Sequence, residues 1–226
     1  MSDWSEQIEQ DLSWRESEIA SLKMQAVSAS AGSDRQRAIL RAIWAMLYAH
    51  YEGFCKFCWD LLLDEIEKRN HRRADAIDAL IKLSLVGVFR NLRGNTSDSA
   101  LWEFFRTNLP MHLSESLAFP QRLETRSNLW PNLFQKNNEA VGLTCVAIDQ
   151  FKDKIGKLVN YRNEIAHGKK LVIKNLDDYK PYEDAAFTIM HDIAIAVVDY
   201  LEQRSYLRAR PSDPDHQAVS TDPQST

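Results

Sequence analysis

One short segment of this 226-residue chain gathers the side chains best suited to chemistry. Arg162 and His167 lie five residues apart in the sequence Tyr-Arg-Asn-Glu-Ile-Ala-His-Gly, and Asn163 directly follows the arginine. Histidine is the side chain that most readily takes or gives a proton near neutral pH. A guanidinium stays charged, and its planar fork can bind two phosphate oxygens at once. These residue types predict acid–base chemistry on a phosphate.

The segment falls on an amphipathic helix predicted over residues 145–168, with Gly168 at its C-terminal end. At about 100° per residue, Arg162 lies in the middle of the apolar face of this helix. That face is formed by Ile148, Phe151, Ile155, Leu158, Val159 and Ile165. A guanidinium is costly to bury without an anionic partner, so either a carboxylate or a substrate phosphate must meet Arg162.

A polar seam runs beside this apolar face at steps of four, three and four residues. It consists of Gly156, Asn160, Asn163 and His167. Asn163 lies one turn before His167 and can orient its imidazole, while Gly156 leaves room for another helix. Arg162 and His167 are about 140° apart around the helix, so one helix does not focus both on a single phosphate. Two copies related by a two-fold axis can do so, which predicts a homodimer with the site at its interface.

The elements that position this segment are expected to be helices throughout. The chain has only 7 Gly and 7 Pro, and its apolar residues recur at three- and four-residue steps. The predicted helices cover residues 3–27, 34–69, 74–91, 98–105, 145–168 and 177–207. We therefore expect an all-α protein, a helical bundle of about six helices with a disordered C-terminal tail.

The expected organisation is an N-terminal amphipathic helix within residues 1–32, a helical domain over residues 33–207, and the tail over residues 208–226. The tail is rich in Pro, Ser, Asp, Gln and Thr and is predicted to be disordered. Pro110 is expected to end the fourth helix because proline breaks a helix interior. Residues 111–138 have a weak pattern that favours loops and short turns.

Charge and cysteine content narrow the function classes. The net charge of −4 argues against a general nucleic-acid coat protein, but it leaves room for an enzyme with one local basic pocket. Three cysteines and an acidic, polar N-terminus indicate a cytoplasmic protein without a disulfide framework. No apolar run approaches the roughly 20 residues that a membrane span needs.

No metal or cofactor is expected. Cys55 and Cys58 form a CxxC pair, but a structural zinc site usually takes four ligands from two separated pairs, and Cys145 stands alone. Both cysteines fall inside a predicted helix among aromatic residues, which favours buried packing. The chain has no glycine-rich phosphate loop and no HExxH motif.

The motif formed by Arg162, Asn163 and His167, late in a helix of an all-α chain, resembles the Arg-x(4–6)-His motif of HEPN ribonucleases. The stretch Tyr-Ala-His-Tyr-Glu-Gly-Phe-Cys-Lys at residues 48–56 is similar to the first core helix of prokaryotic HEPN proteins. The resemblance covers about residues 35–205.

The resemblance implies a dimeric helical bundle that cuts RNA without a metal. In such enzymes the 2′-hydroxyl attacks the adjacent phosphate and leaves a cyclic phosphate. Arg162, His167 and Asn163 are then the candidate catalytic residues. The candidate substrate-binding residues are Lys169, Lys170 and Asn160. Prokaryotic members often act as toxins or antiviral effectors, sometimes with a cognate antitoxin protein.

A different class of function fits the same residues. Arg162 can pair with a buried acid such as Glu52, and His167 can serve only as a cation at the C-terminal end of its helix. The chain would then be a non-catalytic helical module that binds RNA, a nucleotide or a partner protein.

Overall fold

The predicted all-α class is confirmed. The structure, a computed structural model, describes residues 3–94, 96–170 and 173–209, and these residues contain helices and connecting segments but no β-strand. No helix in these ranges is long and apolar enough to cross a membrane. Most of the tail predicted to be disordered, from residue 210 onward, lies outside the described residues.

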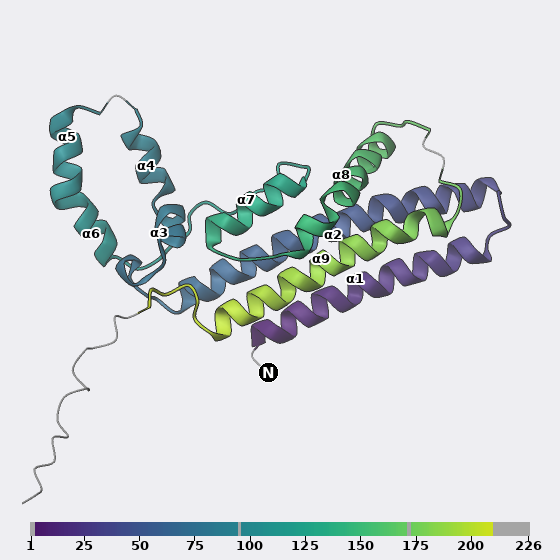
Figure 1. The fold of residues 1–226 in the computed structure, drawn as a ribbon, viewed down its shortest axis with the longest axis horizontal. Coiled ribbons are helices and arrows are strands. Elements are labelled where there is room, and N and C mark those ends of the chain that lie inside the picture. The colour runs from purple at the N-terminus through teal and green to yellow at the C-terminus, as the bar shows by residue number, and fades with distance from the viewer. Residues whose placement is uncertain (1–2, 95, 171–172, 210–226) are drawn as a thin grey trace, which may run out of the picture.

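Three long helices form the body of the molecule: α1 (Asp3–Ser28), α2 (Asp34–Lys68) and α9 (Leu176–Glu202). They run side by side along the long axis, with α1 and α9 both packed against α2 (Figure 1). The hydroxyl of Ser33 caps the start of α2 by accepting a hydrogen bond from the backbone of Gln36 at 3.1 Å. Side chains of all three helices belong to one continuous hydrophobic core.

Two further helices, α7 (Pro131–Val141) and α8 (Ala147–Ala166), lie on the side of α2 that faces away from α1 (Figure 1). The indole nitrogen of Trp59, on α2, donates a hydrogen bond of 2.8 Å to Oδ1 of Asn138, on α7. Both side chains are buried, so this bond satisfies a polar pair inside the core and fixes α7 against α2.

Shorter helices form an arm that stands away from the end of α2 (Figure 1). After a 3-10 turn at Arg73–Asp75, it comprises α3 (Asp78–Ser84), α4 (Val86–Leu92), α5 (Asp98–Glu103), a π-helical turn (Phe104–Asn108) and α6 (Leu109–Ser114). The single helix expected over residues 74–91 is therefore wrong. The chain breaks at Leu85, whose buried side chain lies in the core while its backbone leaves the helical region.

The expectation that Pro110 ends a helix is also wrong. The backbone N–H of Leu109 bonds to the carbonyl of Phe104, five residues back, which is the spacing of a π-helix. Pro110 lies directly after this π-helical turn, at the start of α6, and the helix continues past it to Ser114. Pro131 likewise begins α7, so part of the segment expected as loops and turns is helical.

A buried polar cluster fastens α1 to α2. Nε of Arg15 donates to Asp11 at 2.7 Å, and Nη1 of Arg15 lies 3.4 Å from Nδ1 of the buried His50. Nε2 of His50 lies 2.9 Å from a carboxylate oxygen of Glu18. Gly53 makes room for this cluster, because a Cβ there would lie 3.0 Å from Nη1 of Arg15. Burial and the charge of Arg15 lower the pKa of His50.

Replacing Asn138 with leucine leaves the buried indole N–H of Trp59 without an acceptor. We expect Asn138→Leu to lower the free energy of unfolding by about 1–3 kcal/mol, the cost of an unsatisfied buried donor. Urea denaturation followed by circular dichroism measures the change. Asn132→Leu, at an exposed position of the same helix, is the control. Equal stability of the two variants would contradict this role of Asn138.

Candidate active site

Helix α8 holds the motif by burying its apolar face. The buried residues Ile148, Ile155, Leu158 and Val159 lie on that face, which packs against α2 and α9. Tyr161 packs edge-on against Trp44 of α2 with ring centres 4.9 Å apart. Arg162 lies half-buried one turn after Leu158, where the helix-wheel argument places it.

The guanidinium of Arg162 lies over an aromatic face. Its Cζ is 4.6 Å from the ring centre of Tyr48, a cation–π contact. Its Nη1 donates to Oδ1 of Asn163 at 2.9 Å, and Oδ1 of Asn128 lies farther away, at 3.5 Å. The groups in contact are a neutral ring and two neutral amides, so none of them compensates the positive charge.

No carboxylate of the described residues forms an ion pair with Arg162, and the alternative pairing with Glu52 is not seen among them. Glu52 instead lies near Tyr48, whose pKa is raised well above its ordinary value by burial first and by Glu52 in addition. The phenol is therefore neutral at physiological pH. Its oxygen accepts a hydrogen bond from the backbone of Leu129 at 2.8 Å.

Several donors of Arg162 are left for a ligand. Within the described part of the chain, only Nη1 of this guanidinium has a hydrogen-bond partner. Nε and Nη2 carry further N–H groups in the planar arrangement that matches two oxygens of a phosphate. A half-buried cation with free donors and neutral neighbours is suited to hold an anion.

His167 stands at the C-terminal end of α8. Its backbone N–H bonds to the carbonyl of Asn163 at 2.9 Å, and Gly168 ends the helix with a φ of +73°. The imidazole is exposed and forms no hydrogen bond, ion pair or ring contact with any residue that the structure describes. The carboxamide oxygen of Asn163 accepts from Arg162, and no contact from it to His167 occurs among the described residues.

The other predicted substrate-binding residues lie around the same end of α8. Asn160 and Lys170 are exposed. Lys169 is exposed too, but its ammonium lies 3.3 Å from a carboxylate oxygen of Glu164, and its backbone carbonyl accepts from Arg41 at 2.8 Å. The structure therefore brings Arg162 and Asn163 together and leaves His167 and both lysines open to solvent.

Tyr48 and Asn128 lie against Arg162 but were not among the site residues predicted from the sequence. Tyr48 supports the guanidinium with its ring, yet in the sequence it is one of many aromatic residues on α2. Asn128 follows two residues with positive φ, Arg126 at +52° and Ser127 at +63°. A turn of this kind has no hydrophobic period, so no pattern in the sequence indicates that Asn128 reaches α8.

The cysteine pair plays no part in this site. Cys55 and Cys58 are fully buried in α2, as predicted, and burial raises the pKa of both thiols well above the ordinary value. In the part of the chain that the structure describes, no group of three or more His, Cys, Asp or Glu side chains is arranged to hold a metal ion.

Comparison with known proteins agrees with the resemblance to HEPN proteins. Residues 4–206 match the family model described as HEPN_MAE_28990-like HEPN, a match that includes α1 and runs to the end of the helical body. Searches of curated proteins and of solved structures gave no match. With most of its length matched by that model, the chain belongs to the MAE_28990-like HEPN family.

Proposed function

We propose that this protein is a metal-independent endoribonuclease whose active site uses Arg162 and His167 from two copies of the chain. The observation that carries the proposal is the state of Arg162. It is half-buried, its contacts are neutral, and no described carboxylate pairs with it. A backbone phosphate of RNA supplies the missing negative charge and fits the free N–H donors.

The reaction needs one base, one acid and one group that stabilises charge. His167 accepts the proton of the 2′-hydroxyl as its oxygen forms a bond to the adjacent phosphorus. Arg162 stabilises the negative charge that grows on the phosphate oxygens. The bond from phosphorus to the 5′-oxygen then breaks, and His167 of the second copy gives that oxygen a proton. The products are a 2′,3′-cyclic phosphate and a free 5′-hydroxyl.

The position of the two side chains on α8 supports the use of a second copy. Arg162 is held over α2, whereas His167 is exposed about 140° further around the helix. Gly156 lies on the same side as His167, and a Cβ added there would meet nothing within 4 Å. This polar seam is therefore open to α8 of another copy around a two-fold axis.

Uncontrolled cleavage of RNA harms a cell. The proposed activity therefore fits a toxin or an antiviral effector, and a cognate antitoxin protein fits as its partner. Such a partner would have to block the exposed side chains of Lys169 and Lys170 and the polar seam on α8.

The first test is RNA cleavage in the presence of EDTA. We expect the wild-type protein to leave 2′,3′-cyclic phosphate ends, and His167→Ala to be at least about 100-fold slower, since it lacks the acid–base group. The control is His191→Ala, which removes an exposed histidine that pairs with Glu16 on α1 at 2.8 Å. Equal cleavage by wild type and His167→Ala would reject the catalytic role and favour a non-catalytic module.

A second test separates charge from geometry at Arg162. Arg162→Lys keeps the positive charge but loses the planar fork and its bond to Asn163. We expect about a 100-fold loss of cleavage rate with an unchanged circular dichroism spectrum. Lys157→Gln, on the exposed side of α8, is the control and should keep the full rate. Full activity of Arg162→Lys would show that the guanidinium does not act on the phosphate.

The dimer is tested by filling the open seam. We expect Gly156→Leu to shift the mass measured by light scattering from two copies to one, and to abolish cleavage in parallel. Gly87→Leu is the matched control, because a Cβ at Gly87 of α4 also meets nothing within 4 Å. A Gly156→Leu protein that is monomeric and fully active would contradict the two-copy site.

A further inference from the structure

A second polar feature lies on the same side of the molecule as α7. It is a cavity of about 560 Å³ between α4, the connection that follows α6, and α7. Its lining residues are Arg90, Pro120, Gln121, Arg122, Leu123, Glu124, Arg126, Leu133, Lys136 and Asn137. Four basic side chains and one acidic side chain therefore line it, in a chain whose net charge is −4.

Most of this positive charge is not compensated within the described structure. Arg122 is paired with Asp64 at 2.7 Å and with Glu67 at 3.1 Å. Arg90 donates only to the neutral amide of Gln121, at 3.0 Å. Arg126 and Lys136 are exposed, and neither forms an ion pair with a residue that the structure describes.

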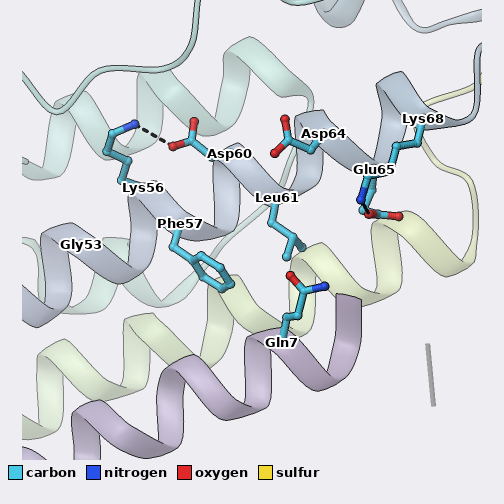
Figure 2. A pocket seen from close by; sticks show the side chains of 9 residues that line it. All are labelled: Gln7, Gly53, Lys56, Phe57, Asp60, Leu61, Asp64, Glu65 and Lys68. Atoms are coloured by element: carbon cyan, nitrogen blue, oxygen red, sulfur yellow. Dashed lines mark hydrogen bonds and ion pairs between the residues drawn. The ribbon is translucent and has the colours of Figure 1, made fainter. Parts of the chain in front are cut away.

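The groove shown in Figure 2 is the natural comparison. It lies between α1 and α2 and has a volume of about 370 Å³. Its charged lining residues are Lys56, Lys68, Asp60, Asp64 and Glu65. Lys56 pairs with Asp60 at 2.7 Å, and Lys68 pairs with Glu65 at 2.6 Å. Both lysines of that groove are neutralised, so the Figure 2 groove has no such excess of unpaired basic charge.

A tight turn joins the cavity to Arg162. The backbone N–H of Asn128 bonds to the carbonyl of Thr125 at 3.0 Å, and Arg126 lies inside this turn. Arg126 lines the cavity, while the side chain of Asn128 lies 3.5 Å from Nη1 of Arg162. Consecutive Cα atoms are about 3.8 Å apart, so the Cα atoms of Arg126 and Asn128 are at most about 7.6 Å apart.

We propose that the α4–α7 cavity binds backbone phosphates of the RNA strand that passes Arg162. Its basic side chains suit phosphate, and unpaired Arg and Lys are the groups that bind a nucleic-acid backbone. None of the described residues that line the cavity is aromatic, so they offer no surface on which a base can stack. The cavity therefore positions the strand without reading its sequence. The link to cleavage rests on the function proposed above.

Binding and cleavage are measured separately to test this. A fluorescent 20-nucleotide RNA is titrated with the full chain carrying His167→Ala, at several salt concentrations, and anisotropy is recorded. In that background, Arg126→Gln with Lys136→Gln should weaken binding about 10-fold and reduce the slope of log affinity against log salt by about 1.4, or 0.7 per lost phosphate contact. The matched control, Lys56→Gln with Lys68→Gln, removes the same charge from the Figure 2 groove and should change neither quantity.

The measured affinity and salt dependence decide whether the cavity binds RNA phosphates. Unchanged affinity and slope in the Arg126 and Lys136 variant, or equal losses in the control, would overturn the proposal. Displacement of RNA by 5 mM inorganic phosphate at constant ionic strength, to the same extent in the Arg126 and Lys136 variant as in its parent, would also overturn it, because phosphate would then compete with RNA at another site. The expected losses in binding, found together with no cleavage by the wild-type protein, would support the cavity and reject the nuclease.

Discussion

The contact between one guanidinium and one phenol ring constrains the rest of the site. Arg162 cannot lose its charge, and its nearest neighbours are the ring of Tyr48 and the amides of Asn163 and Asn128. A nearby carboxylate would stabilise the cation more strongly, but it would also occupy the donors that a phosphate needs. These neutral contacts leave the side chain partly buried, oriented and with donors still available to an anion.

Tyr48 contacts both α8 and the segment that precedes α7. Its ring face supports the arginine of α8, and its hydroxyl accepts the backbone N–H of Leu129, which lies next to Asn128. One side chain of α2 therefore fixes α8 and the segment before α7 relative to each other. Because Tyr48 is fully buried, like Leu47 and Tyr51 beside it on α2, the site is supported by side chains of the hydrophobic core.

The helices whose apolar residues recur at helical spacing could be predicted from the sequence. The long helices α1, α2, α8 and α9 were expected close to their observed bounds, and Arg162 was expected within the apolar face of α8. The helix boundaries of the arm were not predicted correctly. The break at Leu85 depends on tertiary packing, and the π-helical turn before Pro110 depends on a changed hydrogen-bond register. Asn128 could not be found either, since positive φ at Arg126 and Ser127 redirects the chain locally.

The distribution of charge then explains how an acidic chain can handle a polyanion. A net charge of −4 gives no long-range attraction for RNA, so affinity must arise from short-range contacts at sites where basic groups lack partners. Arg162 and the α4–α7 cavity are two such sites, and the turn at residues 125–128 connects them. The Figure 2 groove, whose lysines are paired, has no such excess. Binding would therefore depend on which arginines and lysines are left unpaired, and not on the total number that the chain contains.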